Sequence, residues 1–589
     1  MEWEMVYKKV AGIYGLALGA DTPPLFPLRD DEPTAKKAGD GNGPAGKATA
    51  APDVEIDFDN MAARVEPFPV PRGNYRRLAA IDGGVLYLNA GHGDFNRFEF
   101  RTPGPFELVA FSFKDRKEHE LIKGVGSYAL SPDAAWIAYR KGKKVGLRKV
   151  QPLGGPPPGA GKGAKTSRGG GMLDLAGLRT FLDPRAEWHQ IFWEAWRMER
   201  DFYYDPAMNG LDWKALGERY GRLIDDASCP QDLTYVIGEL IGELGTSHTY
   251  VFGRDLHRKA ERVNVGLLGA RYQLDTKAGR YRIVKIYRAP EWTSGLVAPL
   301  ARPGVGVREG DYLLAVNGRP VTGDREIYAF FQDLAGKQIE ITVNSTPSLE
   351  GARTVRVRPI GSDRELRYLD WVEHNRKVVD RASGGKIGYI HLPDTYLSSA
   401  RIFPAYYYGQ TQKEGLIIDG RFNGGGLDPY IFLERLNRPV LSFWTRRNSH
   451  DQVTPWMLTR ARMALITDRH AGSGGDELPM EFRELGMGPI IGTRTWGGLV
   501  GVSMFISMVD GGGLTAPDYR IYTPRGKWIV ENEGVQPDYE VWLDPAEMAK
   551  GHDAQLEKAI EVVQQEIEDN PVTWPGHPAL PGEKSGARQ

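Results

Sequence analysis

The chain has little cysteine, no long apolar run and no excess of either charge. Cys229 is the single cysteine among 589 residues, which excludes an internal disulfide and suits a reducing compartment. No uninterrupted apolar stretch reaches the ~20 residues that a membrane-spanning helix needs. The formal net charge is −1, with acidic and basic residues interleaved. The sequence therefore predicts neither a nucleic-acid partner nor binding to a membrane surface.

The first residues have some features of a secretory signal peptide. Residues 1–24 contain a lysine pair, a short apolar run and Ala20 just before Asp21. However, Glu2 and Glu4 offset the two lysines, and glycines interrupt the apolar run. A β-strand is the favoured interpretation, so the sequence predicts a cytoplasmic protein, with secretion as the alternative.

The first 150 residues have the pattern of antiparallel sheet. Apolar and polar residues alternate over 77–91, 107–124 and 134–150, and turn-forming pairs such as Asp-Gly separate the runs. Repeated strand–turn–strand units are also typical of β-propeller blades. Roughly two or three blades' worth of chain is present, which is too little to close a propeller.

Two segments have a low-complexity composition. Residues 35–53 and 154–171 are rich in Gly, Pro, Ala and Lys and contain almost no large apolar residue, so they cannot bury enough surface to form a core. The second contains GAGKGAKT, which resembles a phosphate-binding loop. Ala164 replaces the second glycine of that motif, and no apolar strand precedes it, so we interpret the segment as a linker.

Helical periodicity begins after the linker. Apolar residues recur at helical spacing over 187–204, 212–226 and 231–245. The third helix is predicted to end at Gly245, and the polar pair Ser247–His248 follows it.

Residues 262–360 return to strand patterns. The sequence VGLLG at 265–269 opens a strand, and 309–321 forms a hairpin pattern with an Asn-Gly turn. Together these pieces resemble a PDZ domain, which binds peptides by adding them to a sheet as a further strand. Ordinary turns of a β-domain remain the alternative.

Residues 361–545 alternate short apolar strands, such as LIID and ALIT, with helical stretches. This is typical of an α/β domain, in which reactive residues lie just past the strand ends. The sequence therefore predicts a multidomain α+β protein. Its predicted regions are a propeller-like β region (1–153), a linker (154–172), a helical domain (173–261), a PDZ-like domain (262–360), an α/β domain (361–545), and a C-terminal helix and tail (546–589).

Two loops at strand ends contain candidate catalytic groups. After LIID, the glycines 424–426 permit close backbone approach and can direct N–H groups at an oxyanion or a peptide. After ALIT, Ser473 lies between glycines at a predicted helix start, where the N–H groups and dipole favour negative charge. A plain glycine turn and a helix N-cap serine are the alternatives.

A serine nucleophile needs a base within hydrogen-bond reach. His470 lies three residues before Ser473, which is a poor position from which to reach the same hydroxyl, and His391 lies at a strand end. His248 is the favoured candidate, because its neighbour Ser247 can orient it.

Five motifs occur in one order along the chain: GTSHTYV, DGRFNGGG, AGSGGDELP, GTRTWGG and VENEGVQPDYEV. In this order they resemble the tricorn protease family, whose members run from a propeller through helical and PDZ domains to an α/β domain. The resemblance extends over nearly the whole chain, with a shortened propeller region, and the α/β domain also resembles that of C-terminal-processing proteases. It implies a serine endo- or exopeptidase that cleaves short peptides without a metal or cofactor. It also implies a homo-oligomer whose products other peptidases degrade further.

The resemblance implies a role for individual residues. Ser473 would be the nucleophile and His248 the general base, with Ser247 and Glu531 completing a tetrad. The oxyanion would be held by the N–H groups of Gly426 and Gly474. The residues implied in binding the substrate backbone are Gly424, Gly425, Gly426, Gly501, Val502 and Ser503.

The chain departs from the family pattern at two places. Gly474 stands where the family has an aspartate after the nucleophile, which preserves a backbone N–H but not a side-chain role. The acid that gives tricorn its preference for basic residues has no secure match within 441–452. Arg446 and Arg447 there favour acidic substrates and Asp451 favours basic ones, so the side-chain preference stays open.

Two other functions remain alternatives. C-terminal-processing peptidases use a Ser-Lys dyad, but the position of their lysine is Gly498 here, and no lysine lies between Ser473 and Gly526. A histidine-based mechanism is therefore favoured. The second alternative is an inactive scaffold that binds peptides through its propeller-like and PDZ regions.

Overall fold

The computed structural model describes residues 6–7, 11–27, 56–90, 93–95, 100–101, 105–150, 170–253, 262–293, 295–447, 449–503, 505–573 and 575–578. The low-complexity segment 35–53 and the phosphate-loop-like sequence GAGKGAKT lie outside these residues. The chain divides into two compact units, Met1–Phe181 and Leu182–Gln589.

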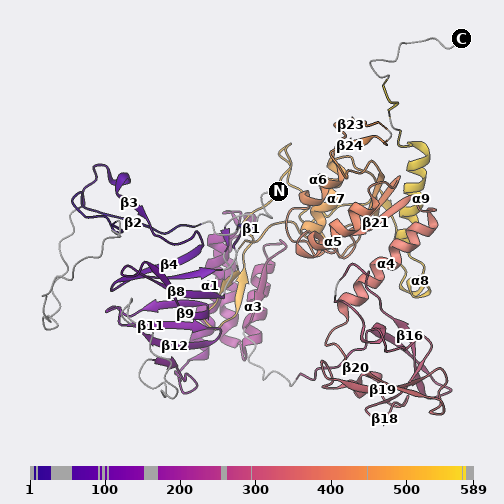
Figure 1. The fold of residues 1–589 in the computed structure, drawn as a ribbon, viewed down its shortest axis with the longest axis horizontal. Coiled ribbons are helices and arrows are strands. Elements are labelled where there is room, and N and C mark those ends of the chain that lie inside the picture. The colour runs from indigo at the N-terminus through magenta and orange to yellow at the C-terminus, as the bar shows by residue number, and fades with distance from the viewer. Residues whose placement is uncertain are drawn as a thin grey trace. The chain divides into compact units, whose positions relative to one another are not determined.

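The first unit is built from antiparallel strands, as its alternating pattern predicts (Figure 1). One four-stranded sheet has the order β4-β5-β8-β9, and a second has the order β10-β11-β12-β13. The strands of these sheets are β4 (Asn74–Ile81), β5 (Gly84–Ala90), β8 (Phe106–Ser112), β9 (Lys117–Val125), β10 (Ser127–Leu130), β11 (Trp136–Lys141), β12 (Lys144–Lys149) and β13 (Gly170–Met172). A four-stranded antiparallel sheet is the content of one propeller blade, and the propeller itself stays a prediction. Shorter pairings join β1 (Val6–Tyr7), β6 (Gly93–Phe95) and β7 (Phe100–Arg101), and β2 (Tyr14–Leu16) with β3 (Val65–Pro67).

The second unit begins with three helices, α1 (Pro184–Phe202), α2 (Trp213–Gly221) and α3 (Pro230–Gly242). Asp183 starts α1 by accepting the N–H of Arg185 at 3.0 Å, and Pro184 occupies a position where no N–H is needed. The indoles of Trp196 and Trp213 each donate to the other residue's carbonyl, at 2.8 and 3.0 Å. These paired contacts join α1 to the start of α2.

The PDZ-like region is a single antiparallel sheet of order β15-β16-β17-β19-β20, with β18 paired to β17. Its strands are β15 (Ala270–Asp275), β16 (Arg280–Ile286), β17 (Tyr312–Val316), β18 (Arg319–Pro320), β19 (Ile339–Asn344) and β20 (Arg353–Val357). The predicted Asn-Gly turn joins β17 to β18, and both Asn317 and Gly318 have positive φ, as a two-residue hairpin turn requires.

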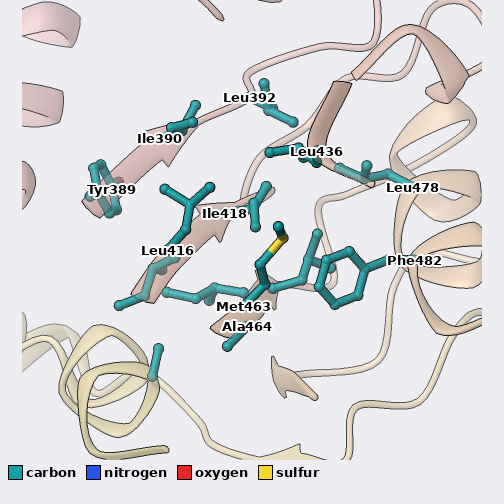
Figure 2. Close-up of a cluster of buried hydrophobic side chains, with 14 of the residues drawn as sticks. Tyr389, Ile390, Leu392, Leu416, Ile418, Leu436, Met463, Ala464, Leu478 and Phe482 are labelled. Carbon is teal, nitrogen blue, oxygen red and sulfur yellow. The ribbon is translucent and has the colours of Figure 1, made fainter. Parts of the chain in front are cut away.

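The α/β region contains a parallel sheet of order β21-β22-β25-β26-β29. Its strands are β21 (Ile387–His391), β22 (Gly415–Asp419), β25 (Arg462–Thr467), β26 (Ile490–Gly492) and β29 (Tyr539–Glu540). The predicted strands LIID and ALIT form β22 and β25, two adjacent interior strands, and both faces of their sheet are apolar. On one face, Leu416, Ile418 and Met463 lie in the same buried cluster as Leu478 and Phe482 of a neighbouring helix (Figure 2).

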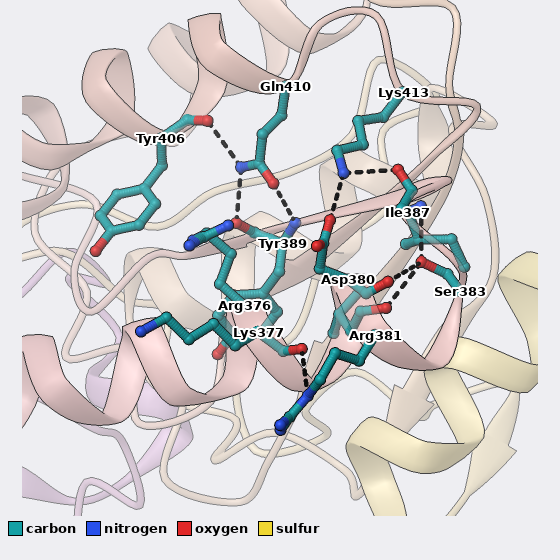
Figure 3. Close-up of polar contacts among 12 residues, drawn as sticks. Arg376, Lys377, Asp380, Arg381, Ser383, Ile387, Tyr389, Tyr406, Gln410 and Lys413 are labelled. Atoms are coloured by element: carbon teal, nitrogen blue, oxygen red, sulfur yellow. Dashed lines mark hydrogen bonds and ion pairs between the residues drawn. The ribbon is translucent and has the colours of Figure 1, made fainter. Parts of the chain in front are cut away.

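The helices of this region are α4 (Arg364–Ala382), α5 (Leu397–Tyr407), α6 (Tyr430–Leu436), α7 (Gly474–Glu484), α8 (Pro545–Lys550) and α9 (Ala554–Asp569). A side chain, rather than another strand, pairs with the outer edge of β21. The amide of Gln410 accepts the N–H of Tyr389 and donates to its carbonyl, both at 3.0 Å (Figure 3). The side chain thereby occupies hydrogen-bonding groups that an open sheet edge would expose.

Smaller elements complete the unit. They are the hairpin β23 (Ser442–Trp444) and β24 (Gln452–Thr454), and the antiparallel sheet β14-β28-β27 formed by β14 (Tyr250–Phe252), β28 (Gly513–Thr515) and β27 (Phe505–Ser507). The β14–β28 pairing joins the end of the helical region to the α/β region, which brings residues 248 and 515 together. Among the described residues, no helix has both the length and the apolarity to cross a bilayer.

Candidate active site

The candidate residues of the α/β region gather at one edge of its parallel sheet. Parallel strands bring their carboxyl ends to the same edge, and loops there form the usual site of such sheets. The loop after β22 contains the glycines 424–426, and the loop after β25 contains Ser473. The loop after β26 continues into Gly501–Ser503, so all three predicted segments start from this edge.

Ser473 lies on a strained turn between β25 and α7. Its φ of 59° and ψ of −121° lie outside the regions that most residues adopt. A side chain on either flanking residue would collide with its surroundings. A Cβ on Gly472 would lie 2.7 Å from the Trp496 ring, and one on Gly474 would lie 2.2 Å from the Thr395 hydroxyl. The turn therefore requires glycine on both sides of Ser473 and presents this residue at the start of α7, as a nucleophile turn does.

Asp476 holds this turn in place. Its fully buried carboxylate accepts the N–H of Ser473 at 2.9 Å, of Gly497 at 2.8 Å and of Gly498 at 3.1 Å. Burial raises the pKa of Asp476 above its ordinary value, although these hydrogen bonds oppose the shift. The side chain thus joins the nucleophile turn to the loop after β26.

The glycine loop lies directly against Ser473. A Cβ on Gly425 would lie 2.6 Å from Cβ of Ser473 and 2.9 Å from the nitrogen of Gly474. Gly425 and Gly426 have φ values of 74° and 140°, which favour glycine. The loop after β22 and the turn after β25 therefore share one small space.

Only some N–H groups of this loop remain available to a ligand. Gly424 donates to Pro393, Gly425 to the side chain of Asn423, and Leu427 to Thr395. Within the described part of the chain, no hydrogen-bond acceptor faces the N–H of Gly426 or of Gly474. These are the two donors that the family resemblance implies for the oxyanion.

Ser247, His248 and Glu531 form one hydrogen-bonded chain, although 284 positions separate Ser247 from Glu531. Glu531 accepts the N–H of Ser247 at 2.7 Å and its hydroxyl at 3.0 Å. The Ser247 Oγ lies 2.9 Å from Nδ1 of His248. Glu531 is 6 % exposed and also accepts the N–H groups of Leu499 and Val500 at 2.6 and 2.9 Å.

The hydrogen bonds from Glu531 through Ser247 to His248 determine which nitrogen of His248 carries the proton. Ser247 has one hydroxyl proton, and it donates that proton to Glu531. The Oγ of Ser247 must then accept the Nδ1–H of His248, which leaves Nε2 unprotonated. A neutral imidazole with a free Nε2 is the form that a general base requires.

Burial lowers the pKa of His248 below its ordinary value of 6.5, and the charge of Glu531 partly opposes this shift. The imidazole is therefore neutral over a wider pH range than a solvent-exposed histidine. A lowered pKa keeps the base available in mildly acidic solution.

The backbone dihedral angles around the Glu531–Ser247–His248 hydrogen bonds are unusual. His248, Val530 and Asn532 all have positive φ, and this is rare for a β-branched residue such as Val530. The amide of Asn532 donates to the carbonyl of Gly245 at 2.8 Å and its N–H to Gly497. Strained residues of this kind cluster at functional sites, where surrounding contacts hold them.

Residues 496–500 connect the two halves of the site. The carbonyl of Gly498 accepts the N–H of Ser473 at 3.0 Å, while the next two N–H groups bind Glu531. The ring of Trp496 packs on Gly472 and lies 5.8 Å from the His248 ring, measured between centroids. One segment thus contacts both the predicted nucleophile turn and the predicted base.

The predicted backbone-binding segment is partly occupied by internal bonds. Gly501 pairs with Tyr519, donating to its carbonyl at 2.8 Å, and the N–H of Ser503 donates to Asp518 at 2.7 Å. No described acceptor faces the N–H of Val502. Strand addition of a peptide here would therefore use Val502 first.

The other histidines considered from the sequence have different surroundings. His391 is 3 % exposed and contacts the hydroxyl of Tyr368 and the carbonyl of Arg421, so it belongs to the core. The ring of His470 stacks on Phe422. Arg446 and Arg447 lie between the exposed strand β23 and its partner β24.

Several supporting residues had no sequence signal of their own. Asp476 lies three residues after Ser473 in the same motif, in which only the serine has a recognisable role. Asn423 precedes the three glycines, and its side chain accepts the N–H of Gly425. Arg421, 1 % exposed, is paired with Asp419 and Asp553 and precedes the glycine loop in the sequence. Motif context marks these positions, but only the fold shows which groups they bind.

A group of three carboxylates lies next to the site. Ligand oxygens of Asp428, Glu477 and Glu481 lie within 4.8 Å of one another. Acidic side chains often gather without an ion, and we base no metal site on them.

Models of three sequence families match the second unit. They are the tricorn protease C1 domain over residues 184–242, the tricorn protease PDZ domain over 266–362, and peptidase family S41 over 386–541. They occur in the order of the helical, PDZ-like and α/β regions.

Whole-chain comparisons agree with these matches. The chain is 32 % identical to tricorn protease homolog 1 of Streptomyces coelicolor, over 98 % of this chain and 53 % of that protein. It is 31 % identical to a putative tricorn-like protease C-terminal subunit of Sulfurisphaera tokodaii, over 88 % of this chain and 58 % of that protein. The crystal structure of the tricorn protease superimposes with a TM-score of 0.74 and 27 % identity, over 88 % of this chain and 49 % of that one. The chain thus spans about half the length of the relatives it matches.

Proposed function

We propose, from the premise that this chain belongs to the tricorn protease family, that it is a serine peptidase that hydrolyses short peptides. The observation that carries the proposal is the hydrogen-bonded chain from Glu531 through Ser247 to His248. It leaves Nε2 of His248 free to accept a proton, at a site that also contains the half-buried, glycine-flanked Ser473.

In the proposed reaction, Nε2 of His248 removes the proton of the Ser473 hydroxyl as Oγ attacks the peptide carbonyl. The resulting imidazolium is stabilised through Ser247 by the charge of Glu531. His248 then gives the proton to the leaving amine, and water hydrolyses the acyl-enzyme by the same steps. The buried carboxylate does the work of the third member of a Ser-His-Asp triad, with a serine hydroxyl in between.

The tetrahedral intermediate places a negative charge on the former carbonyl oxygen. The N–H groups of Gly426 and Gly474 are suited to bind it, because neighbouring N–H groups of the loop are already occupied and these two are not. The N-terminal end of α7 adds the favourable end of its dipole. An aspartate side chain after the nucleophile is not needed for this role.

The experiment is hydrolysis of a library of short peptides by the full chain, with Ser473→Ala as the comparison. We expect cleavage by the wild type and none by the variant. Glu533→Gln, an exposed change two residues from Glu531, is the matched control and should cleave like the wild type. Equal cleavage by Ser473→Ala would contradict the proposal.

The two alternatives make different predictions. A Ser-Lys mechanism needs a lysine that the segment between Ser473 and Gly526 lacks, and it predicts that His248→Ala retains activity. An inactive scaffold predicts peptide binding without cleavage by any form of the chain. The hydrogen-bonded chain at His248 favours the histidine mechanism over both.

The resemblance also supports wider proposals. Short peptides are the proposed substrates, a homo-oligomer is the proposed assembly, and other peptidases are proposed to act on the products. A cytoplasmic location is proposed from the composition, in particular from the single cysteine.

A further inference from the structure

A row of aromatic rings extends away from His248. Its ring centroid lies 6.0 Å from that of Tyr250, which lies 6.3 Å from that of Phe252. Phe252 in turn lies 5.6 Å from Phe505. The ring centroid of Trp496 also lies 5.8 Å from that of His248. We name these five side chains the aromatic ridge.

The sheet β14-β28-β27 builds the ridge. Residues 250 and 252 alternate along β14, so their side chains point to one side while Val251 packs against the helical core. His248 precedes the strand in a turn and joins the row through its ring contact with Tyr250. Strand β28 lies between the strands that carry Phe252 and Phe505. Its Gly513 leaves the space that the Phe505 ring fills, because a Cβ there would lie 2.0 Å from that ring.

The polar group beneath the ridge is occupied. Thr515 of β28 donates its hydroxyl to the carbonyl of His248 at 2.8 Å and accepts the N–H of Tyr250 at 2.9 Å. This side chain therefore offers its hydrogen bonds to the strand rather than to a ligand. The surface above it is aromatic and has no carboxylate, ammonium or guanidinium group of its own.

The ridge is open to solvent. Tyr250 is 42 % exposed, Phe252 50 %, Phe505 58 % and Trp496 45 %. Single exposed aromatic residues are common, but Tyr250, Phe252 and Phe505 adjoin in a row, and the His248 ring links this row to Trp496. Contiguous patches of this kind mark binding surfaces.

The position of the ridge identifies its occupant. One end is the ring of the proposed base, and Trp496 there also packs on the glycine before Ser473. The other end is β27, which follows the predicted backbone-binding segment Gly501–Ser503 along the chain. A peptide bound with its scissile bond at Ser473 and its backbone near Val502 would lie beside both ends.

We propose that the aromatic ridge is a substrate subsite that binds a large apolar side chain, aromatic or aliphatic, of the peptide. The inference rests on the proposed function and adds the class of side chain that the enzyme prefers. Ring-on-ring and ring-on-alkyl contacts supply the affinity, and they are strongest where both partners lose water.

The test uses fluorogenic peptides that differ at one position at a time. In each, an alanine is replaced by phenylalanine or leucine at successive positions around the cleaved bond. At one position the wild type should cleave the apolar peptide with a kcat/KM roughly tenfold or more above that of the alanine peptide. In Phe252→Ala and Phe505→Ala this preference, the ratio of the two kcat/KM values, should fall to about two- to threefold.

Phe58→Ala is the matched control, since Phe58 is 77 % exposed in the first unit and should leave the preference intact. Labelling of Ser473 by a fluorophosphonate shows whether each variant keeps a competent nucleophile. The inference is overturned if the labelled enzyme shows no preference for the apolar peptide, or if that preference survives in both variants. The proposed function would stand in either case. If the variants change the sedimentation mass but not the preference, the ridge is a surface between copies of the chain, and the inference is overturned.

Binding to Ser473→Ala separates the inference from the proposed function. Affinities for the same peptides, measured by calorimetry, do not require cleavage. If the wild type is not labelled, the proposed function fails. If the apolar peptide binds about tenfold more tightly than the alanine peptide, and Phe252→Ala removes this difference, the ridge is still supported as a peptide site. Equal affinities for the two peptides would overturn the inference.

Discussion

Replacing Glu531 by glutamine tests how the site activates its histidine. In the wild type, Oε2 of Glu531 accepts hydrogen bonds from the Ser247 hydroxyl and the N–H groups of Leu499 and Val500, and Oε1 accepts the Ser247 N–H. Glutamine has one carbonyl oxygen, which would occupy the position with three donors. Its NH₂ group would then face the N–H of Ser247, and the negative charge would be lost.

The charge is the larger loss for catalysis. Hydrogen bonds of 3.0 and 2.9 Å in series place the carboxylate at most roughly 6 Å from the imidazole nitrogen. At that distance and an effective dielectric constant of about 20, the attraction to an imidazolium is about 2–3 kcal/mol. This attraction exists only after His248 has taken the proton, so it stabilises the transition state and not the bound substrate. We expect kcat to fall roughly 30- to 150-fold with KM nearly unchanged.

The pH profile provides a second readout. The charge of Glu531 raises the pKa of His248 against the effect of burial. Without that charge the pKa should fall further, so the acid limb of kcat/KM should move to lower pH. The assay is steady-state hydrolysis over a pH series, with circular dichroism to verify folding. A folded Glu531→Gln variant with kcat within threefold of the wild type and an unmoved acid limb would refute the reasoning.

The remaining predictions concern the nucleophile turn and the base. In Gly425→Ala, the new Cβ would lie 2.6 Å from Cβ of Ser473 at a φ of 74°, so we expect kcat/KM to fall at least tenfold in peptide hydrolysis, and wild-type activity would show that the loop does not set the turn. Asp476→Ala removes the acceptor of three N–H groups and should lower the free energy of unfolding by about 2–4 kcal/mol in denaturant titration. An unchanged midpoint would contradict that estimate. Because burial lowers the pKa of His248, the wild-type acid limb of kcat/KM should have its midpoint below 6.5, and a midpoint above 7 would exclude His248 in the assigned environment.

Local sequence patterns predicted the elements that position the site. Strands buried on both faces of a parallel sheet consist of continuous apolar residues. The short apolar runs LIID and ALIT could therefore be identified as strands from the sequence. The Asn-Gly turn also forms where its chemistry predicts. The third helix was placed less accurately, since α3 ends at Gly242 and the next three residues form a turn before Ser247.

The contacts between distant segments had no such local signal. Glu531 reaches Ser247 across 284 positions because β14 pairs with β28 and brings the helical region to the sheet edge. The family resemblance implied a role for both residues, but neither the periodicity of the sequence nor the spacing of its motifs indicated that they are in contact. The role of Asp476 and the row of rings from Trp496 to Phe505 depend on three-dimensional packing, which one sequence does not encode in any short pattern.

The most direct test of the account is labelling by a fluorophosphonate followed by peptide mapping. The full chain should be labelled at one serine, Ser473, and the rate should fall at least a hundredfold in His248→Ala, because the hydroxyl then lacks its base. Labelling at another serine, or at Ser473 with an undiminished rate in His248→Ala, would contradict the account.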